Sequence, residues 1–159
     1  MYAIGARMKI RTVRTLLVAG AAALAAACAP ESSPEQQVRA MIAEAEQAAE
    51  RRDLSDVMAF VSESYADGRG FDKAQLKNFI RGYFVLHPSI HLAVRVQDLR
   101  FPADGLAQAR VTVGMLGTRT DGSGDDLALA GDIYDFDVEL VREGDQWRLL
   151  RADYRSRGR

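Results

Sequence analysis

The period of the apolar residues changes once along this chain, at Pro88, and that change constrains the fold most. Before Pro88, apolar residues recur every three or four positions, as they do on one face of a helix. After it, apolar and polar residues alternate, which is typical of half-buried strands. Helices followed by consecutive strands predict an α+β domain with an antiparallel sheet. We expect the helices to cover one face of that sheet, because their apolar stripes must be buried.

Three helices are predicted before Pro88. Their expected N-cap residues are Ser33, Asp53 and Asp72. In the first helix, Gln36 stands three positions after Ser33, the spacing of a capping box. This helix is expected to run to about Arg52, and Pro88 ends the third.

Four strands are predicted after Pro88, joined by turns at 102–105 and 143–145. The segment 118–132 is rich in Gly, Asp, Thr and Ser. These residues favour turns, so we predict a long loop there, between the second and third strands.

The first 27 residues are typical of an export signal. They carry four basic residues, no acid, and a 12-residue apolar run that ends directly before Cys28. This run is too short to span a bilayer, which requires roughly 20 residues. Residues 1–7 are expected to be an extension, because Met8 begins a typical signal sequence.

Cys28 is the only cysteine, and the residues 24–28 (Leu-Ala-Ala-Ala-Cys) resemble the lipobox of bacterial lipoproteins. The resemblance implies acyl chains on Cys28, which would anchor the protein in a membrane, with residues 28–33 as a tether. Ala29 then favours the outer membrane over the inner, with the protein facing the periplasm. The alternative is an ordinary secretory signal in which Cys28 is a free thiol.

The 132 residues from Cys28 onward are enough for one domain. All 22 acidic residues lie in this part, against 17 of the 21 basic residues, so its net charge is −5. Such a surface argues against a nucleic-acid partner, whose phosphates require a basic patch. Residues 157–159 are expected to form a basic tail.

Two segments resemble proteins with the nuclear transport factor 2 fold: the helix-to-helix step at 48–56 and the late-strand run at 145–150. That superfamily includes ketosteroid isomerase, scytalone dehydratase, polyketide cyclases and many binding modules. The resemblance implies a cone over residues 34–156, in which a curved antiparallel sheet wraps around three N-terminal helices and leaves a pocket at its open end. It implies little about activity, because different sites occur on one fold.

An isomerase or dehydratase on this fold would need a carboxylate base and donors aimed at a developing oxyanion. The groups available for that chemistry are Tyr65, Asp67, Tyr83, Asp132, Tyr134 and Asp153. Three of them also have an ordinary structural interpretation. Tyr83 and Tyr134 lie in apolar faces, where the ring packs and the hydroxyl reaches the rim. Asp67 precedes a glycine, as turn aspartates do. Tyr83, Tyr134 and Phe136 are expected to line the pocket.

No metal or cofactor is expected. The two histidines, His87 and His91, fall on different predicted elements, and neither has a third ligand nearby in the sequence. Asp135, Asp137 and Glu139 share one face of a strand. We predict that they form a solvated outer face, balanced by arginines of neighbouring strands, and not a calcium site. The arginines considered for this are Arg95, Arg110, Arg148 and Arg151.

The main functional prediction is a membrane-tethered, non-catalytic module. Its pocket, rimmed by Tyr65, Tyr83 and Tyr134, would bind a small apolar ligand or a segment of an envelope protein. The alternative is an acid–base enzyme of the isomerase or dehydratase type that uses tyrosine and aspartate side chains. A third possibility is a structural envelope protein that forms a homodimer through the outer face of its sheet.

Overall fold

The computed structural model describes residues 32–120 and 127–157. The predicted signal, Cys28, most of the tether and residues 158–159 lie outside the described residues. The elements are α1 (Pro34–Glu50), α2 (Leu54–Ala59), α3 (Lys73–Leu86), β1 (Ser89–Ala103), β2 (Leu106–Thr120), β3 (Leu127–Glu143) and β4 (Gln146–Ser156). None of these helices has the length and apolar character needed to cross a bilayer.

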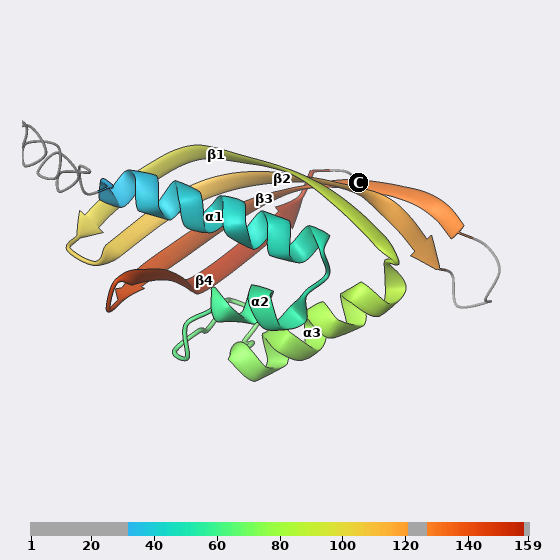
Figure 1. Ribbon diagram of the computed structural model, residues 1–159, viewed down its shortest axis with the longest axis horizontal. Helices are drawn as coiled ribbons and strands as arrows, with labels where there is room; N and C mark the ends of the chain where they lie inside the picture. Colours follow the sequence, from blue (N-terminus) through green and yellow to red (C-terminus); the bar gives the residue numbers. More distant parts are fainter. Residues whose placement is uncertain (1–31, 121–126, 158–159) are drawn as a thin grey trace, which may run out of the picture. The chain divides into compact units, whose positions relative to one another are not determined.

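The four strands form one antiparallel sheet in the order β1-β2-β3-β4, which confirms the predicted α+β class. The strands are long, and β-bulges interrupt the register between Val96 and Asp98 and between Glu139 and Leu140. Bulges and right-handed twist bend long strands. Figure 1 shows the resulting curved sheet with the three helices gathered on its concave side, which is the predicted cone.

The helices begin at the three predicted N-caps. The Ser33 hydroxyl accepts the N–H of Gln36 at 3.2 Å, and the Gln36 side chain accepts the N–H of Ser33 at 2.9 Å. Asp72 forms the same reciprocal pair with the residue three positions later. Asp53 accepts the N–H of Asp56 at 3.0 Å. Each cap supplies a partner for N–H groups that have none within the helix.

Two groups of buried side chains hold the helices to the sheet. In the first, Val38 of α1 packs with Leu140 and Trp147 of the sheet. In the second, Met58 and Leu76 of α2 and α3 pack with Val61 and Tyr65. Leu149 of β4 contacts both groups and so links them.

The predicted loop at 118–132 is wrong for most of its length. β2 continues to Thr120 and β3 begins at Leu127, and the two strands pair throughout, with Thr118 opposite Leu129. Turn-forming residues express only a local preference, which pairing with a neighbouring strand overrides. Gly117 shows why glycine is present in this strand: a Cβ there would collide with the carbonyl oxygen of Ser89 on β1.

The free edge of β1 is covered by two glutamates of α1. The N–H groups of Leu92 and Val94 point away from β2, and they donate to Glu50 at 2.8 Å and Glu46 at 3.2 Å. Glu46 and Glu50 are one helical turn apart, so their side chains extend in the same direction. They satisfy backbone donors that an edge strand would otherwise expose.

Candidate functional site

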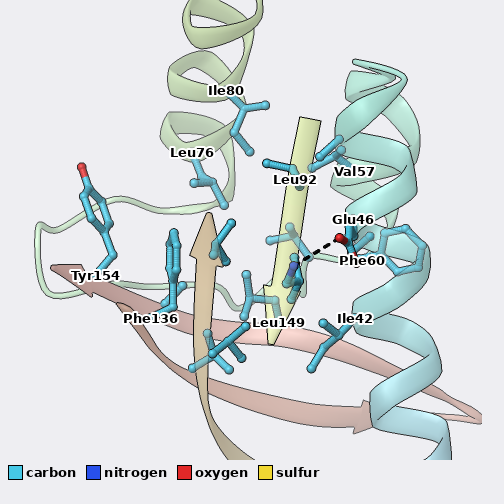
Figure 2. Close-up of a pocket in the computed structure, with 18 of the residues that line it drawn as sticks. Ile42, Glu46, Val57, Phe60, Leu76, Ile80, Leu92, Phe136, Leu149 and Tyr154 are labelled. Carbon is cyan, nitrogen blue, oxygen red and sulfur yellow. Dashed lines mark hydrogen bonds between the residues drawn. The ribbon is translucent and has the colours of Figure 1, made fainter. Parts of the chain in front are cut away.

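A cavity of about 370 Å³ lies between the helices and the concave face of the sheet. All three helices and all four strands contribute to its wall. Figure 2 shows Ile42, Leu76, Ile80, Leu92 and Leu149 converging on it. The volume of the cavity and its lining residues are typical of a small-molecule site, which is mostly apolar with a few polar groups at defined positions.

Among the described residues that line the cavity, those with hydrogen-bonding or charged side chains are Glu46, Tyr65, Arg69, Tyr83, Tyr134 and Tyr154. Glu46 is the carboxylate of this set, and Arg69 is the cation. Figure 2 shows Glu46 and Tyr154 on opposite sides of the cavity. A ligand in the cavity would therefore lie between a possible base and a group of donors.

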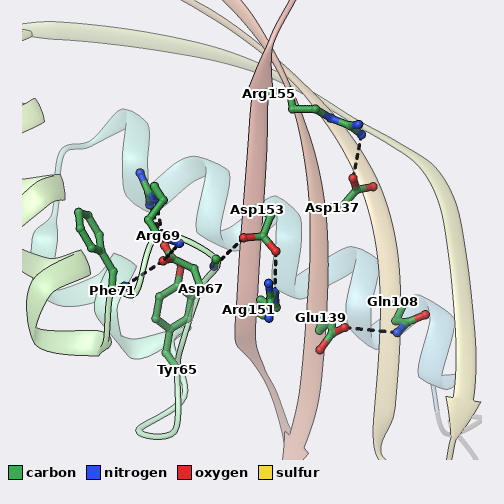
Figure 3. A network of polar contacts seen from close by, with 11 residues as sticks. Tyr65, Asp67, Arg69, Phe71, Gln108, Asp137, Glu139, Arg151, Asp153 and Arg155 are labelled. Atoms are coloured by element: carbon green, nitrogen blue, oxygen red, sulfur yellow. Dashed lines mark hydrogen bonds and ion pairs between the residues drawn. The ribbon is translucent and has the colours of Figure 1, made fainter.

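Asp67 organises the donor side. Its carboxylate has no exposed surface and accepts five hydrogen bonds (Figure 3). Three come from side chains: the Tyr65 hydroxyl at 3.1 Å, and Nε and Nη2 of Arg69 at 3.2 and 2.8 Å. Two come from the backbone N–H groups of Arg69 and Phe71. Asp67 therefore fixes both side chains, as well as the turn that the sequence predicts for it.

The ionisation of this group follows from its contacts. Burial alone would raise the pKa of Asp67, but the hydrogen bonds from Phe71, Arg69 and Tyr65 lower it below its ordinary value. Burial, followed by the adjacent Asp67 charge, raises the pKa of the Tyr65 hydroxyl. Asp67 is thus an ionised, fully occupied anchor and is not suited to act as a base, while Tyr65 stays protonated.

Arg69 is held flat among aromatic rings. Its guanidinium lies 4.5 Å from the ring centroid of Phe71, 4.8 Å from that of Tyr154 and 5.2 Å from that of Phe79. Nη1 also donates to the Tyr154 hydroxyl at 3.2 Å. Cation–π contact and the Asp67 clamp together restrict the side chain.

The structure divides the predicted site residues between two places. Tyr83, Tyr134 and Phe136 line the cavity. The Tyr83 hydroxyl donates to Met115 Sδ at 3.3 Å. Burial, with further contributions from Tyr134 and Asp132, raises the pKa of Tyr83. Asp132 is close enough to act on Tyr83 but is itself exposed and does not line the cavity.

Tyr65 also lines the cavity, but it is buried and donates to Asp67 instead of standing free on a rim. Asp153 does not line the cavity; it accepts the N–H of Gly68 at 2.8 Å and pairs with Arg151 at 2.6 Å. His87 stacks on Tyr83 with 3.9 Å between ring centroids.

Glu46 and Arg69 were missed in the sequence. Glu46 stands one turn after Ile42, at the margin of the apolar stripe of α1, and a helical projection would have marked it as facing inward. Arg69 lies between two glycines in a loop, and no periodicity indicates where its side chain points.

The outer face of the sheet carries the predicted acids with arginine partners. Asp137 pairs with Arg110 at 3.2 Å and Arg155 at 2.9 Å, and Asp135 pairs with Arg157. Of these arginines, the sequence analysis had considered Arg110 alone. The face is charged and solvated, as predicted.

Three solved structures illustrate what the fold resembles. A provisionally assigned scytalone dehydratase from Novosphingobium aromaticivorans is 12% identical, with 78% of this chain and 84% of that chain covered and a TM-score of 0.69. A ketosteroid isomerase-like protein from Erwinia carotovora atroseptica is 14% identical (77% and 95% covered, TM-score 0.60). The hexachlorocyclohexane dehydrochlorinase LinA-type3 from Novosphingobium barchaimii is 10% identical (78% and 86% covered, TM-score 0.65).

The chain therefore has the nuclear transport factor 2-like fold that the sequence resemblance implied. No protein-family model matches the chain, and no curated protein matches it by sequence. At these identities the likeness establishes the fold, and the site must be argued from its own residues.

The prediction of a non-catalytic module is wrong by this comparison. The structural neighbours are named as a dehydratase, an isomerase-like protein and a dehydrochlorinase, which fits the enzymatic alternative better. The sequence analysis had favoured binding because no catalytic set could be recognised. It had placed Glu46 on the polar face of the first helix, whereas the structure places that carboxylate on the cavity wall.

Proposed function

We propose that this chain is an acid–base enzyme that removes a proton from carbon in a small, mostly apolar substrate, in an elimination or an isomerisation. One observation carries the proposal: an apolar cavity presents the carboxylate of Glu46 together with Arg69 and tyrosine hydroxyls. The names of the structural neighbours support the same class, because the loss of water or of hydrogen chloride begins or ends with loss of a proton.

Glu46 is the proposed general base. One of its oxygens accepts the N–H of Val94, which fixes the carboxylate at the wall. In the described part of the chain the other oxygen has no hydrogen-bond partner, so it can accept a proton from a bound substrate. Negative charge then develops on the substrate, and donors across the cavity stabilise it. Such stabilisation is strong in an apolar, water-poor site. These proton transfers need only side chains of the chain itself.

The chain provides a matched control for the base. Glu46 and Glu50 both accept an N–H of β1, but only Glu46 lines the cavity. Glutamine keeps the accepting oxygen and loses the basicity. Glu46→Gln and Glu50→Gln should therefore preserve the edge of β1 equally and differ in catalysis.

The experiment uses the full chain with β-tetralone in D₂O and with a β-hydroxy ketone of similar size. NMR follows exchange of the α-hydrogen in the first and loss of water in the second. We expect wild type and Glu50→Gln to accelerate at least one reaction, and Glu46→Gln to lose about 100-fold or more of that acceleration. Equal rates in the two variants, or no acceleration by wild type, would contradict the proposal.

We also propose that acyl chains on Cys28 hold this enzyme on the cell envelope, facing the periplasm and on the outer membrane. The basic first segment, the short apolar run and the small residues before Cys28 support this. Mass spectrometry should find a lipid-modified sulfur, and Cys28→Ser should move the protein from the membrane to the soluble fraction. An unmodified thiol would reject the anchor.

A further inference from the structure

The donors of the Asp67–Arg69–Tyr154 group are not all occupied. A guanidinium carries five N–H groups. Arg69 uses two on Asp67 and one on the Tyr154 hydroxyl. In residues 32–120 and 127–157 the remaining two, one on each terminal nitrogen, have no acceptor. Tyr154 accepts from Arg69, so its own proton is available for another partner.

The two residues that carry these donors, Arg69 and Tyr154, both line the cavity, and both are partly exposed there. Their positions are restrained. The rings around the guanidinium and the Asp67 clamp hold it in one plane. Tyr65, by contrast, donates its hydroxyl hydrogen bond to Asp67. The geometry thus leaves a pair of adjacent donors, from a loop and from β4, for an acceptor atom of a ligand.

The charge balance of the wall limits what that acceptor can be. The Asp67 carboxylate lies 2.8 Å from Nη2 of Arg69 and offsets its positive charge. Glu46 adds a negative charge on the other side of the cavity. An anionic ligand would therefore enter an apolar space whose nearby charges sum to a negative value, without an unpaired cation to compensate its desolvation.

We infer that Arg69 and Tyr154 form a subsite for an uncharged oxygen of the substrate, and that Asp67 makes this subsite selective for neutral over anionic groups. The inference deepens the proposed function and rests on it in one respect: the cavity is the substrate site. Tyr154 and Arg69 are the residues that contact the ligand oxygen. Asp67 is a positioning residue, because it acts through Arg69.

The test measures binding without turnover. The dissociation constants of β-tetralone, of tetralin and of the corresponding tetralin carboxylate are determined for the full chain by ligand-observed NMR. We expect the ketone to bind about 10-fold tighter than the hydrocarbon, and also tighter than the carboxylate. Equal affinity for ketone and hydrocarbon, no binding of either, or a preference for the carboxylate would overturn the inference.

Three variants test which residues cause the preference for the ketone over the hydrocarbon and over the carboxylate. Tyr154→Phe removes one oxygen and should lower the ketone-to-hydrocarbon ratio about 3- to 10-fold. Asp137→Ala changes the outer face of the sheet and not the cavity, and should leave the ratio unchanged. Asp67→Asn should shift the preference toward the carboxylate by about 10-fold or more. Unchanged ratios in Tyr154→Phe and Asp67→Asn would overturn the inference.

Two controls distinguish a failure of the subsite from misfolding and from a failure of the proposed function. Asp67→Asn is expected to lower stability, so circular dichroism accompanies it; if it does not fold, the wild-type ligand series and Tyr154→Phe decide the question. Glu46→Gln should keep the ketone preference while losing turnover. If wild type shows turnover but no preference for the ketone over the hydrocarbon, the subsite alone is rejected. If wild type prefers the ketone but shows no turnover that depends on Glu46, the proposed function alone is rejected.

Discussion

Asp67 and Asp137 both pair with arginine, yet they have different consequences for the molecule. Asp67 has no exposed side-chain surface, while 51% of the Asp137 side chain is exposed. Asp67 accepts from Arg69, Tyr65 and two backbone N–H groups, next to the cavity. Among the described residues, the partners of Asp137 are Arg110 and Arg155 on the outer face of the sheet.

The difference shows that burial, and not the type of pair, determines what an aspartate–arginine contact does. On the outer face water competes for both partners, so the pairs contribute little to stability. Beside the cavity the Asp67 side chain itself is removed from water, and an unpaired carboxylate there would be costly. The Asp67 contacts therefore fix Arg69 and Tyr65 in one arrangement, whereas the outer face tolerates change.

Removal of Asp67 should have the largest effect. Asp67→Ala takes a buried acceptor from the Tyr65 hydroxyl and from the backbone N–H groups of Arg69 and Phe71, and we expect the free energy of unfolding to fall by about 3 kcal/mol. Urea unfolding of the full chain measures the change. A loss below about 1 kcal/mol would show that Asp67 behaves like a surface residue and would remove the contrast with Asp137.

The pH dependence of stability should depend on the same carboxylate. The pKa of Asp67 lies below its ordinary value of 3.8, because hydrogen bonds outweigh the opposing effect of burial. The folded protein thus binds this proton less tightly than the unfolded chain does. Its stabilising contribution is complete above pH 3.8 and is lost as the pH falls through the lower folded value.

Asp67→Asn removes this titration. We expect a shallower decline in the free energy of unfolding below about pH 4 than in wild type, measured by urea unfolding at a series of pH values. An equally steep decline in the two proteins would mean that another carboxylate causes the loss of stability in acid.

A smaller effect is expected for Tyr65→Phe. The ring stays in its buried group, while Asp67 loses one of five hydrogen bonds. Loss of one such bond should cost about 1 kcal/mol in thermal unfolding. No change at all would indicate that the Tyr65 hydroxyl contributes nothing to holding Asp67.

The smallest effect is expected for Asp137→Ala. Water and the remaining outer-face charges replace its partners, so the free energy of unfolding should change by less than about 1 kcal/mol. Because salt screens exposed charges, the difference from wild type should shrink further in high salt. A salt-insensitive loss as large as that of Asp67→Ala would refute the distinction drawn between the two faces.

The sequence by itself determined the fold class and the starts of the helices. Ser33 and Asp72 each contact their capping partner three positions later. The spacings of apolar residues that predict helices and strands also involve residues only a few positions apart. These contacts form between near neighbours, so they depend little on the rest of the chain. The predicted loop at 118–132 failed because strand pairing extended past its local turn signals.

The tertiary structure alone decided the site. Arg69 and Tyr154 are 85 positions apart, and Glu46 and Val94 are 48 apart. They meet because the register of four strands and the path of one loop bring them to the same cavity. The order of residues does not encode that convergence locally: it results from packing the helices against a curved sheet, in which each side chain's surroundings depend on all the others.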